Sequence, residues 1–139
     1  MNREELKKIL PHREPMLLID EAERTAEKTS TGKYTVRGDE WFLQGHFPGH
    51  PVVPGVMLCE MVAQTGAVVI ADKLEGRLAV YAGIKNARFK RSVQPGDTLD
   101  MEVTITREKG PFFFTEGKGY VNGELAVSGE FSFALVKGV

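Results

Sequence analysis

Two titratable residues stand close together in the sequence, where an irregular loop meets an apolar stretch. His46 follows Gly45 in the loop, and Glu60 lies 14 positions later in a run of apolar residues. A histidine is well suited to take a proton near neutral pH. A carboxyl group in apolar surroundings tends to hold its proton and can donate it. The pair predicts acid–base chemistry, with His46 as the base and Glu60 as the acid.

The elements around this pair explain how it would be positioned. Residues 44–55 contain too many prolines and glycines for a helix or a central strand. The sequence from Gly55 to Leu74 suits a buried helix, with Gly76 as the residue that follows its end. Gln64 lies one turn after Glu60 and is expected to orient it by a hydrogen bond. The free N–H of Gly55 at the helix start could polarise a carbonyl, as in an oxyanion hole.

Plainer interpretations of these residues remain open. His46 could be a structural loop histidine, Glu60 could pair with a buried cation, and Gly55 could serve only a tight turn. Zinc is not expected, because Pro48 and Gly49 prevent His46 and His50 from aligning as helical ligands. The single cysteine, Cys59, is most simply a packing residue, and the basic run at residues 88–91 is most simply a solvated strand end.

The rest of the chain predicts an α+β fold. The expected strands alternate apolar and polar residues or form apolar runs, and they cover residues 17–26, 31–37, 78–90, 99–107, 112–121 and 125–136. Turns are expected at Ser30–Gly32, Pro95–Asp97 and Asn122–Gly123, and a short capped helix is expected from Asn2 to Leu10. A sheet wrapped around one apolar helix is the simplest arrangement.

Composition narrows the class of protein. With 139 residues, the chain is expected to be one domain, residues 1–139, with a core of its own. A net charge of −1 gives no general attraction to nucleic acid or acidic membranes. One cysteine and the absence of a signal-like or membrane-spanning run predict a cytoplasmic protein.

A long motif then connects the chain to a known family. The stretch His46-Phe-Pro-Gly-His-Pro-Val-Val-Pro-Gly-Val-Met-Leu-Cys-Glu60, with Gln64 beyond it, resembles the FabZ-type 3-hydroxyacyl-acyl-carrier-protein dehydratases. The resemblance extends upstream to residues 10–20 and downstream to residues 82–91 and 93–97. His50 and Trp41 depart from the common pattern, but neither belongs to the predicted catalytic pair.

The resemblance implies a hot-dog fold, in which a curved antiparallel sheet wraps one long central helix. It implies reversible dehydration of a (3R)-hydroxyacyl thioester to the trans-2-enoyl thioester in type II fatty-acid synthesis. His46 and Glu60 match the family's base and acid, contributed by different chains of a homodimer. Three dimers commonly form a hexamer. Gly55 N–H would stabilise the thioester oxygen.

The partner implied is an acyl carrier protein, an acidic protein that carries the substrate on its phosphopantetheine arm. Residues Arg88, Lys90 and Arg91 are the candidates for docking it. No metal or organic cofactor is expected. Three rivals remain: a hot-dog thioesterase, a dehydratase that also isomerises, and a catalytically silent acyl-carrier-binding subunit. The isomerising relatives usually carry aspartate at the position of Glu60, which favours the simple dehydratase.

Overall fold

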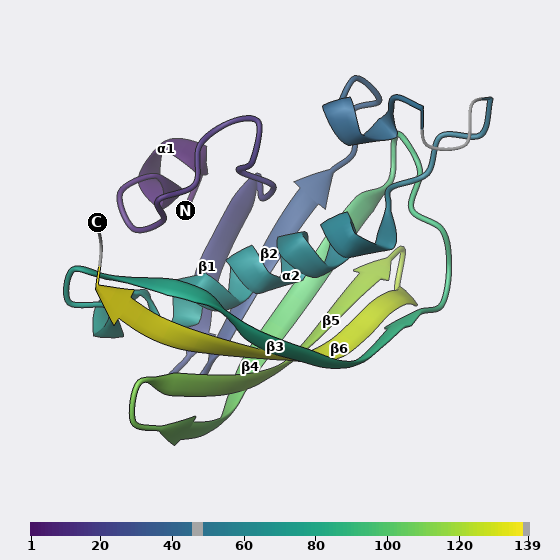
Figure 1. Ribbon diagram of the computed structural model, residues 1–139. Helices are drawn as coiled ribbons and strands as arrows, with labels where there is room; N and C mark the ends of the chain where they lie inside the picture. The colour runs from purple at the N-terminus through teal and green to yellow at the C-terminus, as the bar shows by residue number, and fades with distance from the viewer. Residues whose placement is uncertain (46–48, 138–139) are drawn as a thin grey trace.

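A six-stranded antiparallel sheet curves around one long helix in the computed structural model, which describes residues 1–45 and 49–137 (Figure 1). The strands are β1 (Glu21–Ala26), β2 (Thr29–Thr35), β3 (Arg77–Phe89), β4 (Thr98–Lys109), β5 (Phe112–Val121) and β6 (Glu124–Lys137). The helices are α1 (Arg3–Leu6) and α2 (Gly55–Val69), with 3-10 turns at Trp41–Leu43 and Ala71–Lys73. The strand order is β1-β2-β4-β5-β6-β3, so β1 and β3 form the edges. The predicted α+β hot-dog fold is confirmed.

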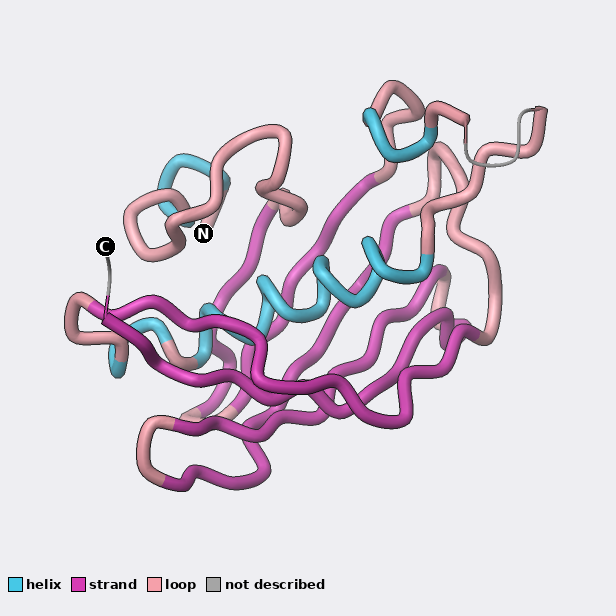
Figure 2. The backbone as a smooth tube through the Cα atoms, in the orientation of Figure 1, coloured by secondary structure: helices cyan, strands magenta, loops and turns pink. Residues whose placement is uncertain are grey.

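Helix α2 lies in the hollow of the sheet, as Figure 2 shows in cyan against magenta strands. Its sequence allows this because most of its residues are apolar on every side of the helix, and nearly every side chain from Met57 to Val69 is buried. Alternate residues of β4 and β5 face the helix. A Cβ atom at Gly117 of β5 would lie 2.4 Å from Val62 of α2, so glycine lets the two elements meet closely.

The N-terminal half differs from the expected boundaries. The first strand begins at Glu21 and not at residue 17. Leu18 N–H donates to the side chain of Gln64, and the backbone first bonds to β2 through Asp20 N–H and the Lys33 carbonyl. The turn lies at residues 27–28, whereas Gly32 is paired within β2. Glycine is needed there because a Cβ would lie 2.6 Å from Thr65 of α2.

Both helices end earlier than expected. The predicted capping box at Asn2 and Glu5 is present, but α1 ends at Leu6 and isolated turns continue to Leu10. Helix α2 ends at Val69 and passes into the 3-10 turn before Gly76, whose φ is +82°. The hairpin turn at Asn122 and Gly123 has the predicted positive φ angles. In the part of the chain that the structure describes, no helix is long and apolar enough to cross a membrane.

Candidate active site

Glu60 points from the middle turns of α2 into a pocket of about 270 Å³. Its side chain is 19% exposed, so it lies at the border between the core and the pocket. The Gln64 amide donates a hydrogen bond of 2.7 Å to Glu60 Oε2, as the spacing of one turn predicts. A carboxyl held in this way has a fixed orientation toward anything that enters the pocket.

Gln64 also joins the helix to the N-terminal segment. It is 1% exposed, accepts from Leu18 N–H at 2.8 Å through Oε1, and donates to the Met16 carbonyl at 2.7 Å through Nε2. These bonds satisfy both ends of a buried amide and connect residues far apart in sequence. The sequence predicts only the bond from Gln64 to Glu60, because nothing local to residues 16–18 reveals that they pack on α2.

His12 is a second residue that the sequence does not assign. Its Nε2 lies 3.5 Å from Glu60 Oε2, and both side chains line the pocket. The only earlier sign is its place in the stretch at residues 10–20 that resembles the family. No regular periodicity leads to it, since it lies in an irregular segment between α1 and β1.

The rest of the pocket wall is mainly apolar. It is formed by Ala63, Ala67, Ala79, Val80 and Phe133, together with Gln64 and Tyr81. Tyr81 donates its hydroxyl to the Cys59 carbonyl at 3.1 Å, and burial and the nearby Glu60 charge raise the pKa of Tyr81. Tyr81 is therefore a neutral hydroxyl near neutral pH. Such a wall suits an alkyl chain beside a single carboxyl group.

Gly55 is the first residue of α2, as predicted, and Phe89 lies against it. A Cβ at Gly55 would come within 3.0 Å of the Phe89 ring. The N-terminal amides of a helix lack intrahelical acceptors, so they can bind a developing negative charge. Phe89 ends β3 and places the following basic residues near this helix start.

His46 lies outside the described residues, so its predicted role stays a prediction. The described glycines on either side of it, Gly45 and Gly49, have φ angles of +79° and +86°. Left-handed geometry of this kind favours glycine. The loop backbone therefore needs these glycines, in agreement with an irregular loop.

The three proposed docking residues have different surroundings. Arg88 and Lys90 are exposed at and beyond the end of β3. Arg91 instead pairs with Glu124 at 3.1 Å and with Asp97 at 3.7 Å. Two of the three guanidinium and ammonium groups thus face solvent, while Arg91 is partly held by its own chain.

The other groups that the structure describes have plainer interpretations than a second site. Cys59 is buried, and burial, followed by the charge of Glu60, raises its pKa, which suits packing more than nucleophilic attack. Among residues 1–45 and 49–137, no three histidine, cysteine, aspartate or glutamate side chains gather as metal ligands. Since His46 is not among them, the expected absence of a metal stays a prediction. A larger hollow of about 750 Å³ along β1, β2 and β4 contains neither Glu60 nor His12.

Comparisons with known proteins identify the family of this chain. Residues 10–130 match the model of the FabA-like domain family. The 3-hydroxyacyl-[acyl-carrier-protein] dehydratase FabZ of Staphylococcus epidermidis is 48% identical over 134 residues, which cover 94% of this chain and 92% of that protein.

Solved structures show the same fold at lower identity. The dehydratase heterocomplex ApeI:P from Xenorhabdus doucetiae superposes with a TM-score of 0.80 at 23% identity, covering 94% of this chain and 90% of that one. A hypothetical thioesterase with coenzyme A from Streptococcus pneumoniae superposes with a TM-score of 0.66 at 13% identity, covering 84% and 85%. The fold alone is therefore shared by more than one chemistry, and the family assignment comes from the sequence match. This chain belongs to the FabZ-type 3-hydroxyacyl-[acyl-carrier-protein] dehydratases of the FabA-like family.

Proposed function

We propose that this protein catalyses the reversible dehydration of (3R)-hydroxyacyl-acyl-carrier-protein to the trans-2-enoyl form in type II fatty-acid synthesis. The observation that carries the proposal is Glu60, held by Gln64 at the edge of an apolar pocket in a chain of this family. The reaction needs an acid beside the alkyl chain of the substrate. The pocket provides Glu60 as the acid and an apolar wall against which the chain can lie.

The reaction divides between two proton transfers. His46 takes the C2 proton, and the electron pair of that C–H bond forms the C2=C3 double bond. Glu60 gives its proton to the C3 hydroxyl, which leaves as water. The Gly55 N–H at the start of α2 stabilises negative charge on the thioester oxygen. Each positioned proton-transfer group contributes about 10²–10⁴-fold in rate.

The active unit in this proposal is a homodimer in which His46 of one chain faces Glu60 of the other. Strand β3 supports it, because this 13-residue edge strand exposes large apolar side chains such as Val80, Tyr81 and Ile84. A long apolar edge of this kind is a surface for pairing with another strand. Pairing β3 of two copies would continue the sheet, and three dimers would give the hexamer common in this family.

The acyl carrier protein would dock beside the helix start. Arg88 and Lys90 are exposed next to Phe89, which contacts Gly55, so an acidic partner there would bring its arm close to the proposed thioester site. Reversing both charges is expected to raise KM for the carrier-protein substrate while leaving kcat unchanged. With a short thioester that has no carrier protein, the double variant and the wild-type protein should have the same activity.

The proposal also covers the domain, its location and the cofactor. Residues 1–139 act as one catalytic domain in the cytoplasm, and no cofactor takes part. The proton transfers need only side chains, and the phosphopantetheine arm arrives with the substrate. Arg91, with its own acidic partners, would play the smaller part in docking.

The experiment that tests the function is hydration of a crotonoyl thioester, with enoyl absorbance and thiol release followed together. The proposal expects loss of the enoyl signal without thiol release. It also expects that His46→Ala or Glu60→Ala nearly abolishes turnover while the circular dichroism of the fold is retained. Thiol release would instead assign the protein to the thioesterases. Binding of substrate with neither signal would make it a silent subunit.

A further inference from the structure

The reaction described above leaves one contact of Glu60 without a role. His12 Nε2 lies 3.5 Å from Glu60 Oε2, the same oxygen that accepts from Gln64 at 2.7 Å. The histidine is half-buried and forms part of the pocket wall, and it comes from a different element than the helix that carries Glu60. Two nitrogen atoms therefore converge on one carboxyl oxygen.

The other ring nitrogen determines which way His12 presents its proton. Its Nδ1 is buried and has no hydrogen-bond partner among the described residues. A neutral imidazole carries one N–H, and a buried N–H without an acceptor is rarer and costlier than a bare nitrogen lone pair. The favoured tautomer therefore carries its proton on Nε2, the nitrogen that lies 3.5 Å from Glu60 Oε2.

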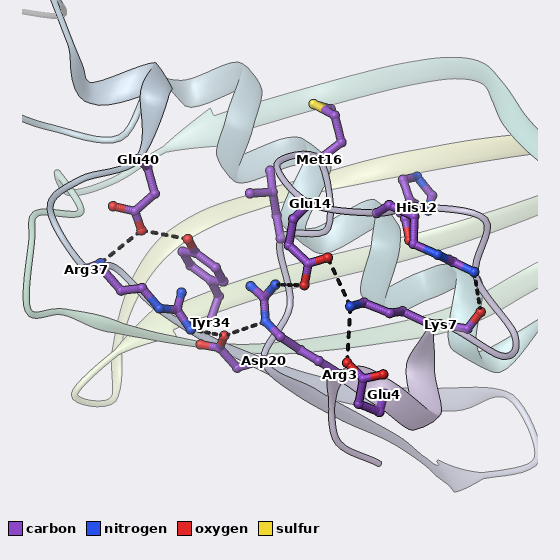
Figure 3. A network of polar contacts seen from close by, with 12 residues as sticks. Arg3, Glu4, Lys7, His12, Glu14, Met16, Asp20, Tyr34, Arg37 and Glu40 are labelled. Atoms are coloured by element: carbon purple, nitrogen blue, oxygen red, sulfur yellow. Dashed lines mark hydrogen bonds and ion pairs between the residues drawn. The ribbon is translucent and has the colours of Figure 1, made fainter.

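The chain around His12 is built to hold the ring in place. On one side, the Arg13 guanidinium donates to the carbonyls of Leu10 at 2.9 Å and Lys7 at 3.0 Å. On the other side, Gln64 fastens the backbone at Met16. Figure 3 shows His12 and Met16 on this segment, next to ion pairs that link it to α1.

Those ion pairs centre on Glu14. Its carboxylate pairs with Lys7 and with Arg3, each at 3.0 Å, and Arg3 also reaches Asp20 at 3.2 Å. Single surface pairs contribute little, but a connected set fixes the path of an irregular segment. The position of His12 is thus determined at both ends of a short stretch of chain.

We propose that His12 is a positioning residue for Glu60, acting through a hydrogen bond from its Nε2–H to Glu60 Oε2. With Gln64 donating to Oε2 and His12 donating to the same oxygen in the reactive state, the carboxyl proton would be held on Oε1, the oxygen that would deliver it to the departing hydroxyl. The inference rests on the proposed dehydration. The separation of 3.5 Å exceeds an ordinary hydrogen bond, and such contacts commonly shorten when substrate binds.

Three substitutions separate this role from simple packing. A glutamine amide can place an N–H where His12 Nε2 lies, an asparagine amide lies nearer to Nδ1, and phenylalanine keeps the ring without any donor. The expected result is that His12→Gln retains most of kcat, whereas His12→Asn and His12→Phe lose about 10- to 100-fold in kcat with little change in KM. In a Glu60→Gln background, His12→Phe should cost nothing further, because the group through which it acts is gone.

Two results in this series would overturn the proposal. One is a kcat for His12→Phe equal to that of the unchanged protein. The other is equal activity of His12→Asn and His12→Gln, which would remove the specific part of Nε2. If the unchanged protein lacks hydratase activity altogether, the proposed function fails, and the contact itself is tested by a measurement that needs no turnover.

That measurement is the ¹⁵N spectrum of the imidazoles, recorded at a pH at which each ring carries one proton. The His12 signals are identified by their loss in His12→Gln. The expected spectrum shows the proton on Nε2, and a changed Nε2 chemical shift in Glu60→Gln because the acceptor beside it is different. A proton on Nδ1, or a His12 spectrum that Glu60→Gln leaves unchanged, would show that the contact with Glu60 does not hold the ring.

Discussion

Gln64→Leu tests the hydrogen bonds by which Gln64 connects α2 to the N-terminal segment and to Glu60. Leucine has nearly the same size but can make none of the three hydrogen bonds of Gln64. The main cost is the Leu18 N–H, which belongs to a residue only 2% exposed and would lose its acceptor. A buried donor left without a partner costs about 1–3 kcal/mol.

The other two bonds change the total less. The Met16 carbonyl belongs to an exposed residue and can bind water, and Glu60 faces the pocket, where water can also reach it. We therefore expect a net loss of about 2–3 kcal/mol in the free energy of unfolding. For a chain of 139 residues, this corresponds to a fall in the thermal midpoint of roughly 6–15 °C.

The assay is thermal unfolding followed by circular dichroism, at one fixed protein concentration because assembly would shift the midpoint. Gln94→Leu is the matched control: it is the same substitution at an exposed residue, and it should change stability by no more than about 0.5 kcal/mol. The hydration assay should show a lower kcat for Gln64→Leu only. Equal thermal midpoints for the two variants would show that the buried hydrogen bonds of Gln64 do not stabilise the fold.

Three further predictions concern packing, acid stability and thiol reactivity. Gly117→Ala should lower the free energy of unfolding by at least about 1–3 kcal/mol in urea titrations, because the new methyl group would overlap Val62, which is fully buried. The pKa of Glu14 is lowered to about 2 by its own backbone amide and by Lys7, so its contribution to stability is present above pH 4.5 and is lost as the pH falls toward 2. Glu14→Gln should therefore flatten the fall in urea midpoint between pH 5 and pH 2.5, and an unchanged slope would contradict this assignment. Cys59 should react with an alkylating reagent far more slowly in the folded protein than in urea, because it is buried and its pKa is raised. Mass spectrometry measures the two rates, and equal rates would contradict the burial of Cys59.

The elements with a regular pattern could be predicted from the sequence. The alternation in β4 and β5 and the apolar run of α2 fix both their type and the face that they bury. The bond between Glu60 and Gln64 follows for the same reason, since four residues make about one turn of helix. Local periodicity therefore specifies the sheet, the helix and one pair of the site.

The contacts of the irregular N-terminal segment could not be predicted in this way. Leu17, Leu18 and Ile19 look like a strand because they are apolar, yet Leu18 gives its N–H to a side chain 46 positions away. His12 reaches Glu60 for the same reason: the path of the segment is set by tertiary contacts rather than by spacing. Gly32 misleads in a similar way, because it is needed for the approach of Thr65 and not for a turn.

The position of α1 and the segment after it has a practical consequence for anyone who trims or tags this protein. In Figure 1, α1 lies beside the sheet rather than within it and could be taken for a dispensable appendage. Removing the first 20 residues would leave all six strands and α2 in the chain, but it would take away the five core side chains of Leu6, Leu10, Leu17, Leu18 and Ile19, so we expect the shortened protein to be much less stable. The product would also lack His12 and both backbone partners of Gln64, so a loss of stability would accompany any loss of activity. Affinity tags are therefore better placed at the C-terminal end.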